Sequence, residues 1–184
     1  MNKSYYLLLL FVALIAFTSC EETSVVNTYD NWRPRNEAFI DSLQSVIDAK
    51  TDPSLFVVTP QITTKYKIYA KKLKAISGDA QVPLYTDTVS VHYRVSLIDG
   101  TVVQQTYLNA NPGDTDSPSS FAVTDEISGR TEVLQLMKLG ERWLVYIPYQ
   151  MAYGTVGQGS IPGYTTLIYD MQLMSITKPV PKKI

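Results

Sequence analysis

The sequence predicts an α+β fold, in which a twisted antiparallel sheet wraps around one short helix and a longer helix precedes them. Three observations lead to this prediction. Residues 35–50 repeat apolar side chains at helical spacing, and residues 89–96 alternate apolar with polar side chains as a strand does. Further short alternating segments follow, separated by turns rich in glycine, proline, asparagine and aspartate. Elements that are segregated in this way along the chain are typical of the α+β class.

The first twenty residues are typical of an export signal. Lys3 precedes an apolar run over residues 5–17, which is shorter than the about 20 residues of a membrane-spanning helix. The sequence Phe17-Thr18-Ser19-Cys20 then resembles a bacterial lipobox, whose cysteine is lipidated and becomes the mature N-terminus. We therefore expect a signal peptide over residues 1–19 and a lipid on Cys20. An ordinary secretory signal followed by an unmodified cysteine is the alternative.

Two acidic residues, Glu21 and Glu22, follow this cysteine directly. They resemble the surface-export signal of lipoproteins in the Bacteroidetes. The resemblance implies a lipid-anchored protein of the cell envelope, on the periplasmic or surface face of the outer membrane.

Composition excludes several classes of function. The chain has 184 residues, a net charge of −1 and a single cysteine, so it has neither an internal disulfide nor a basic field for nucleic acid. It has one histidine, His92, which the strand alternation places on the outward face. No cysteine–histidine cluster or phosphate-binding loop is present in the sequence. We therefore expect no metal and no cofactor.

Polar residues 20–31 are expected to be a tether, followed by an extension of the main domain over residues 32–81. Its helix should begin near Pro34, since proline suits a first helical turn, and end before Pro53. The apolar stripe should dock on the C-terminal domain, with binding of a separate partner as the alternative. The stripe consists of Phe39, Leu43, Val46 and Ile47.

Residues 65–74 hold five lysines, and Tyr66 and Ile68 alternate with two of them. This pattern predicts an exposed edge strand that lysines protect from pairing with another chain. A patch that binds nucleic acid or anionic lipid is the alternative, which the acidic overall balance disfavours.

Residues 82–176 are expected to form the main domain, and residues 177–184 a solvated tail. The expected elements are a strand over 89–96, a turn at Asp99-Gly100, a loop over 109–119, a strand over 121–123, a helix over 131–137, a glycine C-cap at Gly140, a strand over 143–147, a flexible loop over 155–163 and a strand over 166–176.

Five motifs in this region, in order, resemble the FKBP-type peptidyl-prolyl cis-trans isomerases. They are Val91-His92-Tyr93 with the turn 97–102, the helical segment 132–140, Tyr146-Ile147-Pro148, Ala152-Tyr153-Gly154, and Ile161-Pro162 with the strand 166–170. The resemblance implies a sheet wrapped around the short helix, with a peptide pocket between them. It also implies proline-containing polypeptides as partners, and a monomer.

The chemistry of such a pocket needs no nucleophile. The X–Pro bond rotates slowly because its partial double bond must twist against a barrier of about 18–20 kcal/mol. An enzyme needs only to bind the twisted amide better than the planar one. Twisting makes the amide less polar, so a dry aromatic pocket with a few hydrogen-bond donors favours it.

The resemblance assigns roles to residues of this chain. Tyr93, the Tyr153 hydroxyl and the backbone N–H of Ile127 would form the catalytic groups. Phe121, Tyr169 and Ile161 would contact the substrate, although ordinary core packing is the alternative for each aromatic residue.

The sequence departs from the family at several places, and two of them change expected site residues. An aromatic residue expected in the 109–121 loop is also missing near Ser119, and the glycine-rich loop is about one residue short. Val103-Gln104 stands where the family has Phe-Asp, and Arg130 stands where the pocket floor is a tryptophan. Val103, Gln104 and Arg130 are therefore expected to contact substrate in an altered way. A guanidinium on the floor would impair proline binding or recognise a substrate carboxylate. We expect a weak prolyl isomerase that assists the folding of envelope or secreted proteins; the alternative is a non-catalytic module that binds peptides or acts as a chaperone.

Overall fold

The computed structural model describes residues 28–179. The predicted signal peptide, Cys20, and parts of the predicted tether and tail lie outside these residues. Within the described part, residues 31–179 belong to one compact unit. Among the residues described, no helix has the length and apolar character needed to cross a membrane.

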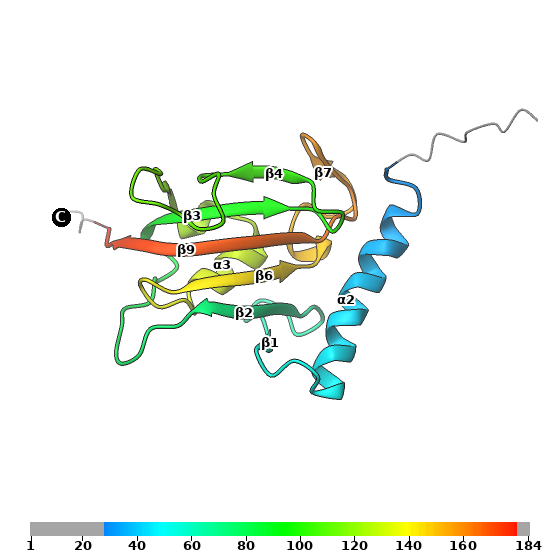
Figure 1. Ribbon diagram of the computed structural model, residues 1–184, viewed down its shortest axis with the longest axis horizontal. Coiled ribbons are helices and arrows are strands. Elements are labelled where there is room, and N and C mark those ends of the chain that lie inside the picture. Colours follow the sequence, from blue (N-terminus) through cyan, green and yellow to red (C-terminus); the bar gives the residue numbers. More distant parts are fainter. Residues whose placement is uncertain (1–27, 180–184) are drawn as a thin grey trace, which may run out of the picture. The chain divides into compact units, whose positions relative to one another are not determined.

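An antiparallel sheet dominates this unit, and its strands follow the order β1-β2-β6-β9-β3-β4, while β5 pairs with β3 beside β4 (Figure 1). Within residues 28–179, two α-helices accompany the sheet, which confirms the predicted α+β fold. The strands are β1 (Leu55–Val58), β2 (Ile68–Lys74), β3 (Thr88–Ser96), β4 (Val102–Gln105), β5 (Ser119–Ala122), β6 (Arg142–Ile147) and β9 (Leu167–Thr177).

The core lies between the sheet and the short helix α3 (Ser128–Leu134). Alternate residues of β3, β6 and β9 are buried against it, as the apolar alternation of these strands requires. Gly129 lets the helix approach closely, because a Cβ atom there would overlap Ile147 Cγ2 on β6. This close approach brings Arg130, the next residue, directly over the sheet.

The N-terminal helix α2 (Trp32–Ala49) docks on the segment that leads into β9. Trp32 Nε1 donates a hydrogen bond to Thr165 Oγ1 at 2.8 Å, and the Thr166 N–H donates to Asn36 Oδ1 at 2.7 Å. Further along, the Phe39 ring lies 5.8 Å from the Tyr146 ring on β6. The helix is therefore part of the domain surface and is not a free element.

Both ends of the predicted central helix differ in the structure. It runs from Ser128 to Leu134, where we predicted 131–137, and Gln135 is its C-cap residue. The predicted glycine C-cap was therefore wrong. Gly140 has φ 90° and lies in the later turn that leads into β6, where a left-handed conformation is needed.

Two further predictions about strands need correction. The lysine-rich strand β2 is not an edge over its first half, because β1 pairs with residues 68–71. The four residues of β1 are too few to show a clear alternation, so this strand was missed. The loop predicted over 155–163 contains a small hairpin of β7 (Gly157–Gln158) and β8 (Ile161–Pro162).

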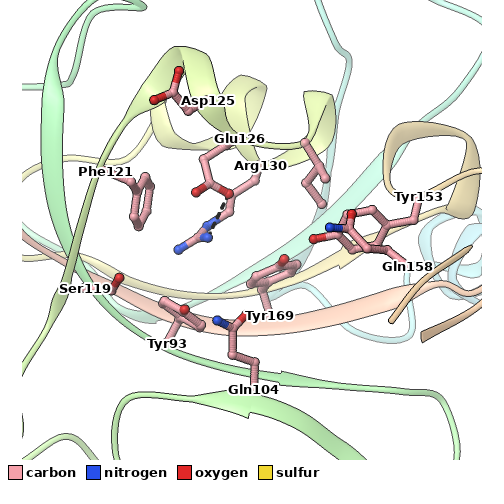
Figure 2. Close-up of a pocket in the computed structure, with 11 residues that line it drawn as sticks. Tyr93, Gln104, Ser119, Phe121, Asp125, Glu126, Arg130, Tyr153, Gln158 and Tyr169 are labelled. Atoms are coloured by element: carbon pink, nitrogen blue, oxygen red, sulfur yellow. Dashed lines mark hydrogen bonds and ion pairs between the residues drawn. The ribbon is translucent and has the colours of Figure 1, made fainter. Parts of the chain in front are cut away.

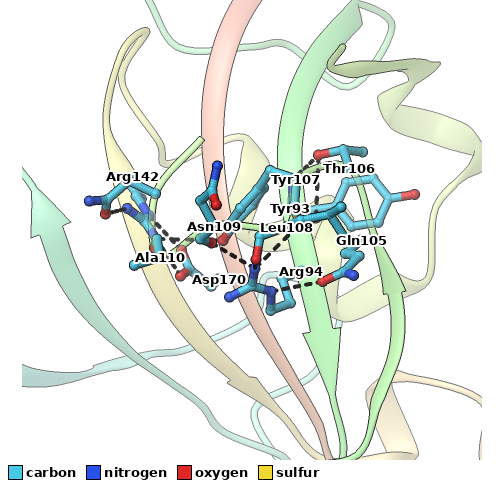
Figure 3. Close-up of polar contacts among 11 residues, drawn as sticks. Tyr93, Arg94, Gln105, Thr106, Tyr107, Leu108, Asn109, Ala110, Arg142 and Asp170 are labelled. Atoms are coloured by element: carbon cyan, nitrogen blue, oxygen red, sulfur yellow. Dashed lines mark hydrogen bonds and ion pairs between the residues drawn. The ribbon is translucent and has the colours of Figure 1, made fainter. Parts of the chain in front are cut away.

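A segment after β4 covers the outer face of the sheet, held by two arginines (Figure 3). Arg94 Nη2 donates to the carbonyl oxygens of Leu108 and Asn109 at 2.9 and 2.7 Å, and Arg142 Nη2 donates to that of Ala110 at 3.0 Å. His92 was predicted to face outward, and it does alternate with Tyr93. It is nevertheless buried, because this segment lies over it.

Candidate active site

A cavity of about 490 Å³ opens between α3 and the sheet (Figure 2). Side chains from β3, β4, β5 and β9 form its sheet side, and the turn before α3 forms the opposite side. Its lining residues are Tyr93, Gln104, Ser119, Phe121, Asp125, Glu126, Ile127, Arg130, Tyr153, Gln158 and Tyr169.

Seven of the nine site residues expected from the sequence line this one cavity. The fold thus brings together residues from six separate parts of the chain. Val103 and Ile161 do not line it; both are half-buried and pack against the core. The pairing with β3 shifts register at Val103, because Val95 pairs with Gln104 while Ser96 pairs with Val102. Val103 is the extra residue of this β-bulge.

Four lining residues were not predicted: Ser119, Asp125, Glu126 and Gln158. For Glu126 a signal existed in the sequence, since a carboxylate four residues before Arg130 is a common ion-pair spacing. Gln158 depends on the β7–β8 hairpin, whose short strands show no periodicity.

Arg130 occupies the floor of the cavity and is surrounded by aromatic rings. Its side chain is 5% exposed, and Glu126 Oε2 accepts a hydrogen bond from its Nη1 at 2.8 Å. The guanidinium carbon lies 4.1 Å from the ring centre of Phe121, 4.5 Å from that of Tyr93 and 5.2 Å from that of Tyr169. Each such contact is worth about 0.5–2 kcal/mol. The rings predicted to hold a proline therefore contact the guanidinium.

The guanidinium is only partly paired. Among residues 28–179, Arg130 Nε and Nη2 are buried and have no hydrogen-bond partner. Figure 2 shows the guanidinium extending from α3 into the space between Phe121, Tyr93 and Tyr169. Unpaired buried donors are uncommon in proteins, because each costs about 1–3 kcal/mol of desolvation.

Two more donors border the cavity. The Ile127 N–H, just before α3, and the Tyr153 hydroxyl each lack an acceptor within the described part of the chain. Burial raises the pKa of Tyr153; Glu126 reinforces this and Arg130 opposes it. Burial raises the pKa of Tyr169 more strongly. Both phenols therefore stay protonated near neutral pH, and the Tyr153 hydroxyl is available to donate to a substrate carbonyl.

The cavity suits binding and hydrogen bonding better than metal or nucleophilic chemistry. No group of three or more histidine, cysteine, aspartate or glutamate residues is close enough to hold a metal ion among residues 28–179. What the site offers is aromatic walls, two neutral donors and one buried guanidinium. These are means of holding a polypeptide segment in a chosen geometry.

Comparison with known proteins agrees with this geometry. The chain is 39% identical over 100 residues to the FKBP-type 22 kDa peptidyl-prolyl cis-trans isomerase of Escherichia coli (strain K12), covering 54% of this chain and 46% of that protein. It is 40% identical over 104 residues to the outer membrane protein MIP of Legionella longbeachae, covering 55% and 42%. The chain thus spans under half the length of these curated relatives.

A solved structure supports the same assignment. The peptidyl-prolyl cis-trans isomerase of Pseudomonas syringae pv. tomato matches with a TM-score of 0.56 and 26% identity, over 78% of this chain and 96% of that one. The family model described as FKBP-type peptidyl-prolyl cis-trans isomerase matches residues 80–174, which include every residue that lines the cavity. The chain belongs to the FKBP-type peptidyl-prolyl cis-trans isomerase family.

Proposed function

We propose that this protein is a peptidyl-prolyl cis-trans isomerase that assists the folding of envelope or secreted proteins. The observation that carries the proposal is the convergence of Tyr93, Tyr153, Tyr169 and the Ile127 N–H on one cavity. The aromatic surfaces favour the less polar, twisted amide, and the two unpaired donors can hold the flanking carbonyl groups.

The activity on ordinary proline peptides should be weak, because Arg130 competes for the aromatic surfaces. Its guanidinium already contacts Phe121, Tyr93 and Tyr169. A proline ring entering the same space would have to displace a paired charge or bind above it. Binding energy lost in this way is not available for the transition state.

The first test is isomerase activity of the purified protein on a neutral proline peptide, measured beside an Arg130→Trp variant. We expect measurable activity in the natural protein and about tenfold higher kcat/KM in the variant, equivalent to about 1.4 kcal/mol. A Lys65→Gln variant is the control, since this exposed lysine does not line the cavity. It should leave kcat/KM unchanged.

A non-catalytic peptide-binding module is the second candidate, and the position of Arg130 between the rings favours it. Fold and activity are separable in many families. If the natural protein binds proline peptides without isomerising them, this second reading replaces the first. If neither the natural protein nor Arg130→Trp isomerises the peptide while both remain folded, the enzyme proposal is wrong.

We also propose that the protein is anchored to the outer membrane by a lipid on Cys20. The lipobox-like sequence 17–20 supports this, as does the similarity to a relative named outer membrane protein MIP. Cells that express the protein should incorporate labelled fatty acid into it, and Cys20→Ser should abolish the label. Equal labelling of both forms would contradict the anchor.

A further inference from the structure

The unpaired part of Arg130 is one particular edge of its guanidinium. Nε and Nη2 lie side by side on that edge and point their N–H bonds in nearly the same direction. Glu126 bonds to Nη1 and leaves this edge free. Arg130 therefore holds two parallel, buried donors on a side chain that lines the cavity of about 490 Å³.

Arg142 shows what this edge binds elsewhere in the same protein (Figure 3). Its Nε donates to Asp170 Oδ1 at 2.7 Å, and its Nη2 donates to Asp170 Oδ2 at 2.6 Å. This is the two-bond geometry that arginine forms with a carboxylate. Arg130 presents the same pair of atoms without a protein carboxylate to receive them among residues 28–179.

We propose that the floor of the cavity binds a carboxylate of the polypeptide substrate through Arg130 Nε and Nη2. This inference rests on the proposed function, because it names the class of substrate that the isomerase site selects. The carboxylate comes from an acidic side chain beside the proline or from the C-terminus of a chain that ends in proline. Both present two oxygens at the spacing of the arginine edge.

Alternative acceptors match less well. A side-chain amide has a single oxygen, so it would satisfy one donor and turn its own NH₂ group toward the other. A backbone carbonyl also has one oxygen. Leaving one of the two buried N–H groups unpaired keeps much of the desolvation cost. A carboxylate satisfies both at once.

The surroundings of Arg130 strengthen such an ion pair. Phe121, Tyr93 and Tyr169 cover the guanidinium, and exclusion of water by these rings raises the strength of electrostatic interactions. Of the two acidic residues that line the cavity, Glu126 is engaged with Nη1 and Asp125 is exposed to solvent. Gln104 and Ser119 add neutral polar groups to the wall.

The test compares peptides that differ only in a carboxylate. One pair carries Glu or Gln directly before the proline, and a second pair ends in proline with a free carboxylate or a C-terminal amide. Dissociation constants of the purified protein for all four peptides are measured by calorimetry, and isomerisation rates are measured for the Glu and Gln pair. We expect the acid of at least one pair to bind about tenfold or more tightly than its amide.

Variants identify the group responsible. Arg130→Gln should abolish the preference, and Arg130→Lys should lose most of it because lysine keeps the charge but lacks the two-donor edge. Lys65→Gln removes the same charge from an exposed site outside the cavity and should preserve it. If the variants do not fold, the comparison of acid and amide peptides on the natural protein still decides the question.

The outcomes separate this inference from the proposed function. Equal binding of acid and amide in both pairs would overturn the carboxylate site, even if neutral peptides are isomerised. A preference that persists in folded Arg130→Gln would overturn it as well. Carboxylate-dependent binding without isomerisation would support the site and reject the enzyme. A preference in the Glu and Gln pair would show that the site binds an acidic side chain. A preference in the pair that ends in proline would show that it binds the C-terminal carboxylate.

Discussion

At the scale of single residues, the buried guanidinium of Arg130 changes what its aromatic neighbours can bind. Phe121, Tyr93 and Tyr169 would form an apolar pocket around a neutral floor residue, but here their faces contact a cation. The Glu126 carboxylate offsets part of the cost of burying that charge. The unpaired Nε and Nη2 donors of Arg130 make the site favour a polar group of the ligand, which the aromatic residues alone would not do.

Tyr153→Phe tests the smallest change in the site. The hydroxyl has no acceptor among residues 28–179, so its removal should leave the free energy of unfolding nearly unchanged. If it donates to a substrate carbonyl, kcat/KM should fall about threefold to tenfold. Because burial raises the pKa of Tyr153, the group stays protonated, and kcat/KM of the natural protein should not decline between about pH 7 and 9.

Tyr85→Phe is the matched control, since Tyr85 is exposed and does not line the cavity. A fall in kcat/KM of the same size in both variants would count against the proposed role of the Tyr153 hydroxyl.

At the scale of elements, Asp52 connects the end of α2 to the sheet. Its Oδ2 accepts a hydrogen bond from Lys71 Nζ on β2 at 2.6 Å, and its Oδ1 accepts from the Ser54 N–H at 2.9 Å. The bond from Lys71, followed by those from Ser54, lowers the pKa of Asp52 from 3.8 to about 2. These contacts hold the turn that precedes β1 against its partner strand.

The stability contributed by Asp52 should depend on pH in a defined direction. Because the folded-state pKa lies below the unfolded one, the contribution is present above about pH 4 and is lost as pH falls toward 2. In urea unfolding, the natural protein should be more stable than Asp52→Asn at pH 7, and the difference should shrink across that range. When Lys71→Met is also present, the difference in the free energy of unfolding caused by Asp52→Asn at pH 7 should be smaller, because Asp52 has lost its cationic partner. A gap between natural protein and Asp52→Asn that stays constant from pH 7 to pH 2 would contradict the assignment.

At the scale of the whole unit, α2 and the sheet are linked by buried hydrogen bonds. Asn36 is fully buried; its Nδ2 donates to the Trp32 carbonyl oxygen, and its Oδ1 accepts from the Thr166 N–H just before β9. Trp32 adds a second link through Thr165. Because these bonds join a helix near the start of the unit to its last strand, α2 and the sheet should unfold together.

Asn36→Ala should therefore destabilise the protein as a whole. The variant leaves the Thr166 N–H buried without its partner, at a cost of about 1–3 kcal/mol. Chemical unfolding followed by far-ultraviolet circular dichroism and by tryptophan fluorescence should show one coincident transition at a lower midpoint. Ser42→Ala, on an exposed position of the same helix, should change the midpoint little. A separate early loss of helix would show that α2 is an independent element.

The sequence alone was sufficient for the features that depend on local pattern. The alternation of Val89, Val91, Tyr93 and Val95 predicted β3, and the apolar stripe predicted α2 to within two residues at its start. Ordered motifs predicted the α+β fold and the family. The unusual arginine at position 130 was also visible, because a motif match shows directly where a chain departs from it.

Only the tertiary structure decided the features that depend on contacts between distant segments. β1 forms because its four residues pair with β2, and His92 is buried because the segment after β4 covers it. The β-bulge at Val103 depends on pairing with β3. The environment of Arg130 is of this kind too. The sequence shows that a charge is present at position 130. The rings around it come from three strands and its partner Glu126 from a turn, and these meet only when the chain folds.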